Sequence, residues 1–594
     1  MRLFFLLALV CAALSVGSAA SNYHENLLLQ PLPPSSLLAS FNFKSNTTQT
    51  SFEQQHFRYF PRALGQILQH ANTRELHLRF TTGRWDSESW GSRPWDGAKE
   101  GGTGVELWAW IEAADEETAF SKWITLTQSL SGLFCASLNF IDSTRTTRPV
   151  ASFEPVGDHS SSGNLHLLHG TLPGEVVCTE NLTPFLKLLP CKGKAGVASL
   201  LDGHKLFDAA WQSMSIDVRP VCPESGECLV QIDQTVDIVL DIERSKRPRG
   251  NPIPRPVPAD KLVCDTSKPY HGRDTCYPLE KAADKSWSIS ELFGRSISGS
   301  CTLADSADFN EEAVCLRISP IREVRPSPDS VETKFTNEFT RCFTPPSESF
   351  DLNVPEQAMA VIATNVPLEQ PVLHAERTIV GHGQERGGMR IIFNNPSSEK
   401  VVDFIYFETL PWFLRPYIHT LQATVTGPDE VRQQVPASEF IKETYYRPGI
   451  DRERGTQLEL ALSVPPASTV TLTYDFEKAI LRYTEYPPDA NRGFNVAPAV
   501  IKVAGPQSGN PIYIRTTSLL LPLPTPDFSM PYNVIILTST VIALAFGSIF
   551  NLLVRRFVTA EEATALRAQT LKGRLGGKIV ALRDRIRGKS SKVE

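Results

Sequence analysis

The sequence predicts a mainly β protein with an α+β N-terminal part, a sandwich-like antiparallel lumenal domain and one C-terminal transmembrane helix. Beyond about residue 200, short runs such as "TQLELALSV" and "STVTLTYDF" alternate apolar and polar residues, which is typical of strands with one buried face. Several such runs at short spacing favour an antiparallel sandwich. Earlier in the chain, "FPRALGQILQHAN" and "DEETAFSKWITLTQSLSGLF" have apolar residues at helical spacing, whereas "RELHLRFT" and "GVELWAWIEA" predict strands.

The two ends of the chain indicate a secreted topology with one membrane span. Residues 1–20 carry Arg2, an uncharged run and small residues, as a cleavable signal peptide does. Residues 532–554 contain no charge, and 23 residues at about 1.5 Å each cross the ~30 Å hydrocarbon layer. The tail 555–594 holds 11 Lys and Arg against 4 Asp and Glu, which keeps it cytoplasmic and predicts a type I protein. An anionic-lipid contact and a plain topology signal both explain this basic tail.

The lumenal region divides at a change of composition. The stretch "ERSKRPRGNPIPRPVPADK" is Pro-rich and basic, as an exposed extended loop is. The expected organisation is therefore a signal peptide (1–20), a lumenal α+β region (21–240), a Pro-rich and basic insertion (241–287), a β-sandwich-like region (288–531), a transmembrane helix (532–554) and a basic cytoplasmic tail (555–594).

Cysteines and sequons fit an oxidising compartment. Without Cys11 of the signal, ten of the 11 cysteines remain, and their even number favours disulfides over metal ligation. "CPESGEC" predicts a short disulfide loop, and two further cysteines flank the end of the insertion. The candidate intrachain disulfide cysteines are Cys222, Cys228, Cys264, Cys276, Cys301 and Cys315. The sequons predict glycosylation at Asn46 and Asn181.

The stretch "VVCTENLTPFLKLLPC" brackets the second sequon with Cys178 and Cys191. A local bridge between them would close a short loop and contribute about 3 kcal/mol in the chain-entropy model. This contribution slightly favours the local bridge, and pairing elsewhere in the chain or with another protein stays open at this point.

A loop with three tryptophans, Trp85, Trp90 and Trp95, lies between two predicted strands. Such a loop is either an interaction surface for protein or lipid, or a cap folded back on its own core. No phosphate loop, HExxH motif or nucleophile elbow occurs, and no histidine adjoins a cysteine in a known pattern. The sequence thus predicts no catalytic residue, no metal, no cofactor and no nucleic-acid partner, which favours a binding or scaffolding role.

Several long stretches resemble the PIG-T family of GPI-transamidase components. They are "RELHLRFTTGRWD", "SGLFCASLNFIDST", "VVCTENLTPFLKLLPCKGKAG", "LPWFLRPYIHTL", "LRYTEYPPDANRGFNV" and "LPLPTPDFSMPYNVIILTSTVIALAFGSIFNLL". They run in family order from about residue 60 to 555, and the length and the insertion resemble fungal members.

The resemblance implies a non-catalytic scaffold subunit of an endoplasmic-reticulum complex. That complex cleaves the C-terminal signal of a precursor protein and joins the new carboxyl end to a GPI lipid through a separate caspase-like subunit. The family cysteine that forms an interchain disulfide with this catalytic subunit matches Cys178, which leaves Cys191 without an assigned partner and an odd number of other lumenal cysteines. The alternatives are a stand-alone lumenal hydrolase or transamidase, and a cell-surface receptor or adhesion ectodomain.

Small and polar residues within the span predict packing against partner helices. They are Thr538, Ser539, Gly547, Ser548 and Asn551.

Overall fold

The computed structural model describes residues 22–590 with gaps. The gaps are 34, 160–163, 224–226, 248–261, 265–275, 279–282, 285, 305–313, 329, 335–338, 347, 359–365, 382, 384, 430, 488, 506–509 and 526–528. The expected signal peptide and most of the expected insertion therefore lie outside the described residues. The chain forms two units, Met1–Pro524 and Thr525–Glu594.

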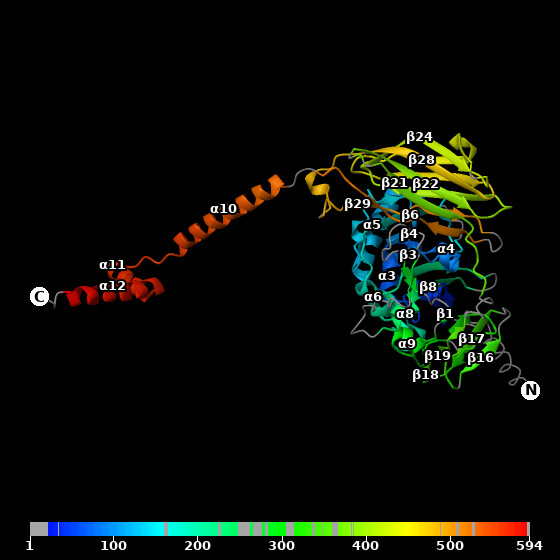
Figure 1. Ribbon diagram of the computed structural model, residues 1–594, viewed down its shortest axis with the longest axis horizontal. Helices are drawn as coiled ribbons and strands as arrows, with labels where there is room; N and C mark the ends of the chain where they lie inside the picture. Colours follow the sequence, from blue (N-terminus) through cyan, green and yellow to red (C-terminus); the bar gives the residue numbers. More distant parts are fainter. Residues whose placement is uncertain are drawn as a thin grey trace, which may run out of the picture. The chain divides into compact units, whose positions relative to one another are not determined.

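A large twisted sheet organises the first unit (Figure 1). Its 11 strands are antiparallel neighbours except β14, which runs parallel to β1. Their spatial order is β16 (Val331–Lys334), β17 (Thr340–Thr344), β14 (Val314–Arg317), β1 (Tyr23–Leu32), β2 (Ser36–Thr48), β8 (Leu229–Asp241), β7 (Trp211–Val221), β3 (Thr73–Gly83), β4 (Gly104–Glu112), β6 (Leu165–Leu172) and β5 (Thr146–Thr147).

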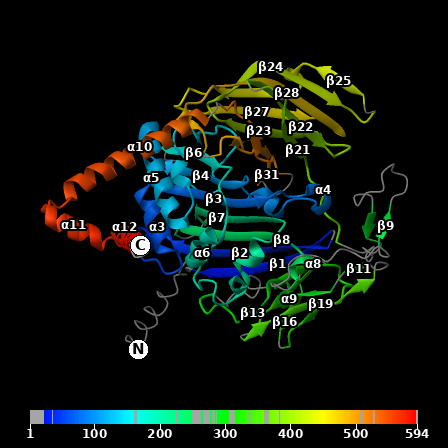
Figure 2. The same cartoon turned by 60° about the vertical axis from the view of Figure 1, so that its left-hand side comes forward.

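Helices cover one face of this sheet and form the main core with it (Figure 2). The longest is α5 (Glu116–Phe134), whose N-cap Asp115 accepts a hydrogen bond from the Thr118 N–H and whose first turn carries Glu116 and Glu117. Acidic residues there complement the helix dipole. The other helices that the structure describes in this unit are α2 (Gln49–Glu53), α3 (Arg62–His70), α4 (Ser87–Trp90), α6 (Thr179–Leu188), α7 (Gly203–Leu206), α8 (Ile242–Ser245) and α9 (Ile289–Phe293), with short 3-10 helices at η1 (Pro94–Gly97), η2 (Leu138–Phe140), η3 (Val197–Leu200), η7 (Ala437–Glu439) and η8 (Tyr483–Glu485).

The predicted boundary between residues 287 and 288 differs from the architecture. Strands β14, β16 and β17 follow that boundary in sequence but extend the N-terminal sheet beyond β1. Their pairing is long-range, so local alternation could not place them. Small sheets complete this part: β9 (Leu262–Cys264) with β10 (Cys276–Pro278), β11 (Ala283–Asp284) with β20 (Gln357–Ala358), β12 (Trp287–Ser288) with β19 (Leu352–Val354) and β15 (Arg325–Pro326), and β13 (Ile297–Ser298) with β18 (Ser349–Phe350).

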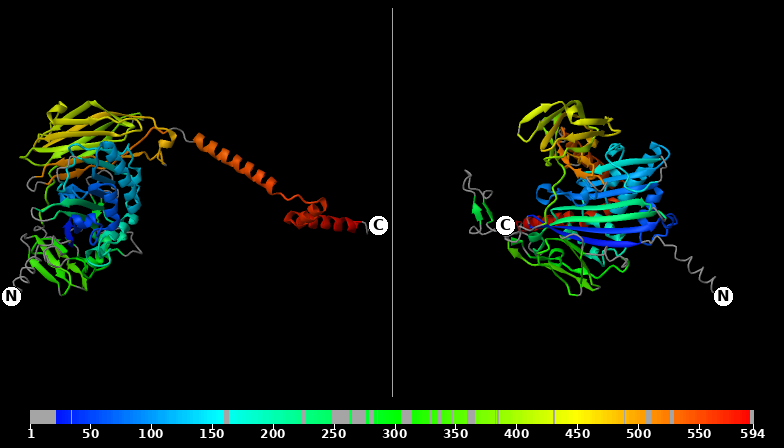
Figure 3. Two further views of the ribbon diagram at one scale, coloured as in Figure 1. Left: turned by 180° about the vertical axis from the view of Figure 1, so that it is seen from behind. Right: turned by 90° about the vertical axis from the view of Figure 1, so that its right-hand side faces the viewer.

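A β-sandwich follows, shown in yellow and orange beside the large sheet in Figure 3. One sheet has the order β21 (His374–Val380), β22 (Arg386–Asn395), β28 (Ser468–Lys478), β24 (Leu414–Thr426), β25 (Arg432–Val435); the other has β26 (Ile441–Arg447), β27 (Thr456–Val464), β23 (Val402–Leu410), β30 (Val500–Val503), β31 (Ile512–Arg515). An additional antiparallel pair, β29 (Phe494–Val496) and β32 (Leu519–Leu521), contributes residues to the core of the sandwich. The inward residues of both sheets share one core, in which Phe393 contacts Phe404 and Tyr406. The predicted mainly β, sandwich-containing fold is confirmed.

An aromatic contact joins the sandwich to the outer face of the large sheet. Trp108 and Trp110 of β4 cluster with Phe153, Phe407 and Tyr513. The large sheet and the sandwich therefore belong to one compact unit and are not two domains joined only by a linker.

The described residues of the second unit form three helices: α10 (Ser529–Val554), α11 (Ala560–Gln569) and α12 (Leu571–Ser590). Within α10, Tyr532–Val554 is long and apolar enough to cross a membrane. This matches the predicted span.

Candidate docking site around Cys178

Cys178 is the residue immediately before helix α6. Its backbone is extended and its half-buried thiol is free. The helix packs on the main core with one face, which carries Asn181, Leu182, Phe185 and Leu188. This spacing is that of an amphipathic helix. Packing therefore fixes the position of the thiol at the start of a rigid element.

Asn181 ties this start to the end of helix α5. Its Oδ1 accepts a hydrogen bond from the Cys178 N–H at 2.9 Å, and its Nδ2 donates to the carbonyl oxygens of Phe134 at 3.0 Å and Cys135 at 3.3 Å. The side chain is 2% exposed. A glycan needs a solvent-facing amide nitrogen, whereas this nitrogen is buried and donates to two carbonyl oxygens. This packing argues against glycosylation at Asn181, which stays a prediction.

Cys135, the other free cysteine among the described residues, follows the last residue of α5. It adopts a left-handed conformation with φ 52° and is exposed. Glu175 accepts a hydrogen bond from the Ser137 N–H at 2.8 Å, which joins the segment after α5 to the segment before α6. Both free thiols therefore lie on neighbouring segments.

Exposed apolar side chains flank these segments. Val176 is 77% exposed and Phe140 is 61% exposed. Large apolar side chains beside a free cysteine favour contact with a second protein, because burying them removes apolar area from water.

The other end of α6 is closed within the chain. Cys191 forms a disulfide with Cys301, 110 residues away, with a Cα–Cα distance of 6.0 Å. A helix of 10 residues separates Cys178 from Cys191, and it spans about 15 Å. Because a disulfide needs Cα atoms within about 7 Å, the local Cys178–Cys191 bridge cannot form here.

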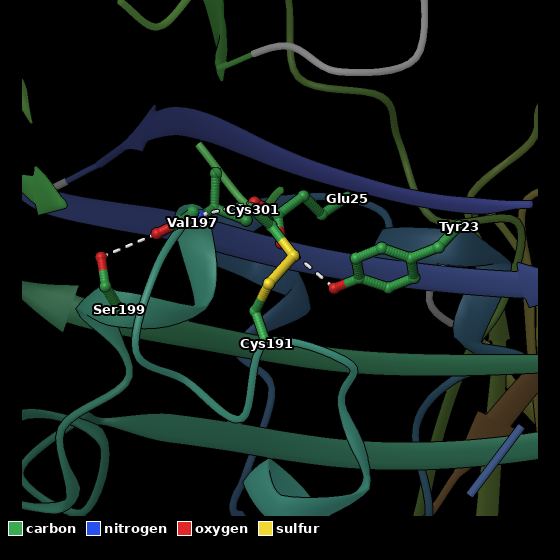
Figure 4. The surroundings of a disulfide bond; sticks show 7 residues. Tyr23, Glu25, Cys191, Val197, Ser199 and Cys301 are labelled. Carbon is green, nitrogen blue, oxygen red and sulfur yellow. Dashed lines mark hydrogen bonds between the residues drawn. A yellow bond between two sulfur atoms is a disulfide. The ribbon is translucent and has the colours of Figure 1, made fainter. Parts of the chain in front are cut away.

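Buried polar contacts surround this disulfide (Figure 4). Glu25 accepts hydrogen bonds from the Tyr23 hydroxyl at 3.1 Å and from the Val197 N–H at 3.0 Å. Gly196 has φ +71°, and a Cβ there would come within 1.7 Å of Glu25 Oε1. Only glycine fits this close approach, so the segment after α6 is held firmly against β1.

Two further disulfides lie within the described residues. Cys222 and Cys228 form a disulfide, and Cys315 pairs with Cys342. Cys264 of β9 lies opposite Cys276 of β10 in the strand register. The side chains of these two cysteines lie outside what the structure describes.

Asn46 lies on β2 with a half-buried side chain. Its Nδ2 donates to Asn22 Oδ1 at 2.7 Å, and its Oδ1 accepts from Gln231 Nε2 at 2.8 Å. Glycosylation at this sequon stays a prediction. The span residues predicted to pack on partner helices (Thr538, Ser539, Gly547, Ser548, Asn551) lie on α10, and packing there also stays a prediction.

The tryptophan loop mostly folds back on the protein. Trp85 and Trp90 are buried against Trp211, with Trp85 in edge-on contact with both rings, whereas Trp95 is 44% exposed. The Trp95 Nε1 donates to Ser40 at 3.2 Å and to Asp237 at 3.3 Å. The cap alternative is therefore correct for two of the three tryptophans.

A buried charge network anchors this loop to the outer face of the large sheet. Lys99 Nζ donates to Asp217 at 2.7 Å and to Asp233 at 2.6 Å. His77 lies between Asp217 at 2.5 Å and Glu75 at 2.7 Å. Lys99 therefore has two carboxylate partners, and Asp217 is also paired with Arg79 at 2.6 Å, as buried charges require for stability.

Two carboxylates of this face have opposite pKa shifts. Burial alone would raise the pKa of Glu75, but the hydrogen bond and charge of His77, the Val156 N–H and a hydrogen bond from His159 lower that pKa to about 2. Burial raises the pKa of Asp237 to about 7, against the opposing effects of the Ser40 and Trp95 hydrogen bonds and of the Lys99 charge. Among the described residues, no group of three or more His, Cys, Asp or Glu could hold a metal ion.

The fold and the site define a class of protein: a β-rich unit followed, among the described residues, by one membrane-length helix, with exposed apolar residues near a cysteine that is unpaired within the chain. The chain belongs to the Gpi16 family, described as "Gpi16 subunit, GPI transamidase component", whose model matches residues 6–580. The predicted PIG-T resemblance is thereby confirmed.

Named relatives agree with this family along nearly the whole chain. The chain is 40% identical to "GPI transamidase component GPI16" of Saccharomyces cerevisiae, over 96% of this chain and 93% of the relative. It is 35% identical to "GPI transamidase component PIG-T homolog" of Schizosaccharomyces pombe, over 97% of this chain and 98% of the relative. It is 33% identical to "GPI-anchor transamidase component PIGT" of Homo sapiens, over 92% of each.

Proposed function

We propose that the chain is a non-catalytic scaffold subunit of the GPI-transamidase complex, joined to a caspase-like catalytic subunit through Cys178. Family membership supports a role as a component of that complex. The observation that carries the tether is the free Cys178 thiol at the rigid start of α6, beside the exposed Val176.

The interchain bond forms by oxidation of two thiols. Cys178 and a partner cysteine each lose a proton and together two electrons, which a disulfide of the oxidising lumen accepts by thiol–disulfide exchange. Cys191 does not compete, because it is already bonded to Cys301.

The proposed topology places the ectodomain in the lumen of the endoplasmic reticulum. Arg555 and Arg556 follow the membrane-length helix directly, and positive residues stay cytoplasmic. In this arrangement the ectodomain positions the catalytic subunit, the GPI lipid and the precursor protein.

Non-reducing electrophoresis of the membrane-extracted complex tests the tether. We expect a larger, reductant-sensitive species that contains the caspase-like subunit, and we expect Cys178→Ser to abolish it completely. Cys135→Ser is the matched control, because Cys135 is the other cysteine without a disulfide partner among the described residues, and it should leave the species intact. A larger species that persists in Cys178→Ser contradicts the tether, and peptidase or transamidase activity of the purified chain contradicts the non-catalytic role.

A further inference from the structure

A cavity of about 490 Å³ lies where the tryptophan loop meets one edge of the β-sandwich. Three segments line it: the loop from Thr81 to Thr103, residues 369–378 including the start of β21, and residues 512–517 with the end of β31. Its volume is within the range of binding pockets for small ligands and short peptide segments.

The edge of a strand, not one of its faces, borders this cavity. β21 is the terminal strand of its sheet, hydrogen-bonded on one side to β22. Consecutive residues of β21, from His374 to Thr378, all line the cavity. Side chains of neighbouring residues point to opposite faces of a sheet, so a cavity lined by consecutive residues must face the backbone edge between them. That edge presents N–H and C=O groups.

The tryptophan loop crosses the cavity rim without pairing with this edge. The loop contacts β21 through side chains only, Arg84 with Glu376 at 3.0 Å and Ser87 with His374 at 3.3 Å. A backbone hydrogen bond from Ser92 to Glu369, at 2.8 Å, lies before β21 begins. Within the described part of the chain, β21 thus keeps an unpaired backbone edge, which proteins usually cover or block.

Close backbone approaches hold the rim in place. Gly97 of the loop has φ +72°, and a Cβ there would come within 1.9 Å of the Tyr513 carbonyl oxygen. Gly91 has φ +75°, and its Cβ would come within 2.7 Å of the Glu369 carbonyl oxygen. The loop is therefore anchored against both neighbouring segments, so the cavity is preformed.

Two carboxylates that line the cavity have no ion-pair partner among the described residues. Its arginines pair with carboxylates: Arg93 with Glu100, Arg84 with Glu376, and the buried Arg377 and Arg515 with Glu408 and Glu106. Asp96 and Glu369 are exposed and form no ion pair with any other described residue. Apolar side chains lie beside them, namely Val372, Leu373, Ile512 and Ile514.

We propose that this cavity binds an extended, basic segment of a partner protein, which adds as a further strand to the edge of β21. Backbone hydrogen bonds to β21 hold the segment, as in β-strand addition. A lysine or arginine of the segment pairs with Asp96 and Glu369, and an apolar neighbour contacts Ile512 and Ile514. The proposal rests on membership of a multi-subunit complex but uses no residue of the Cys178 site.

Fluorescence polarisation with the full chain in detergent tests the proposal. The probe is a fluorescein-labelled peptide of sequence Thr-Val-Lys-Val-Arg-Val-Thr. One comparison peptide carries N-methyl groups on alternate amides and cannot donate to β21; the other has glutamates in place of Lys and Arg. We expect each change to weaken binding at least about 10-fold.

Protein variants complete the design. The double variant Asp96→Asn with Glu369→Gln should weaken binding of the basic peptide about 3- to 10-fold. Glu399→Gln with Asp429→Asn, which removes two exposed carboxylates elsewhere on the sandwich, should leave binding unchanged. Equal affinity for the N-methylated peptide, equal loss in both double variants, or no binding at about 1 mM overturns the proposal.

A photo-crosslink gives the readout in the assembled complex. A benzoylphenylalanine in place of Thr378 should crosslink to a partner segment that contains Lys or Arg, whereas one in place of Gln433, on the opposite edge strand β25, should not. Crosslinking to lipid or glycan, or equally at both positions, counts against the proposal. The Cys178-dependent species on a non-reducing gel is unaffected by these variants, so failure here is distinct from failure of the tether.

Discussion

The tryptophan-loop face and the Cys178 junction both carry residues that are typical of interfaces. The fold buries most of these residues on the loop face but leaves them exposed or half-buried at the junction. On the loop face, Trp85 and Trp90 are buried and Lys99 is held by two aspartates. At the junction, Val176, Phe140 and a free thiol face outward or lie half-buried. An aromatic-rich loop can thus be a structural cap, while an ordinary helix start is the surface available to a partner.

Breaking the charge network should have the largest effect on stability. Lys99→Met removes the cation between the two aspartates, which leaves Asp217 with Arg79 and Asp233 without an ion-pair partner among the described residues, and we expect a loss of about 3 kcal/mol in the free energy of unfolding. Urea unfolding followed by tryptophan fluorescence measures it. Lys187→Met, at an exposed position of α6, is the control and should change little. A loss no larger than the control's would mean that the network does not hold the loop.

Acidification should lower the free energy of unfolding by titrating Glu75 on the same face, and this effect should be comparable to that of Lys99→Met but no larger. The folded pKa of Glu75 is about 2 against 4.5 in the unfolded chain, so its stabilisation is present above pH 4.5 and is lost as pH falls toward 2. Each pKa unit corresponds to about 1.4 kcal/mol, which gives about 3 kcal/mol. Urea unfolding at a series of pH values should therefore show a steeper decline for the wild type than for Glu75→Gln. Parallel declines would contradict the assignment.

At the junction, Asn181→Ala should cost about 2–3 kcal/mol, because it removes the two hydrogen bonds that join α6 to the end of α5 and the one that caps the start of α6. The control is Thr183→Ala, which destroys the sequon but keeps the asparagine. That control should change stability by no more than about 0.5 kcal/mol, and it should leave electrophoretic mobility unchanged because we expect no glycan on so buried an asparagine. A mobility shift in Thr183→Ala would show that the junction is more open than the fold indicates.

The smallest effect is expected at Trp95. Its ring is 44% exposed and its indole donates two long hydrogen bonds, so Trp95→Ala should cost about 1 kcal/mol or less. The same unfolding assay measures it. A cost as large as that of Lys99→Met would place Trp95 in the structural cap with Trp85.

Local patterns predicted the elements well but not their long-range partners. Alternation located β27 and β28, and helical spacing located α3, α5 and the span. Helix α6 was missed, although Leu182, Phe185 and Leu189 recur at helical spacing in "NLTPFLKLL"; that signal would have excluded the Cys178–Cys191 bridge. The sheet position of β14, parallel to β1 and far from it in sequence, has no local signal.

The sequence by itself determined the mainly β class, the membrane-length helix and the family. Only the tertiary structure decided that Asn181 is buried between α5 and α6, that Trp85 and Trp90 cap the protein's own core, and that Cys191 bonds to Cys301 while Cys178 has no disulfide partner among the described residues. The reason is physical. Periodicity and composition act over a few neighbouring residues, whereas burial and disulfide pairing depend on which distant segments packing brings within a few ångströms.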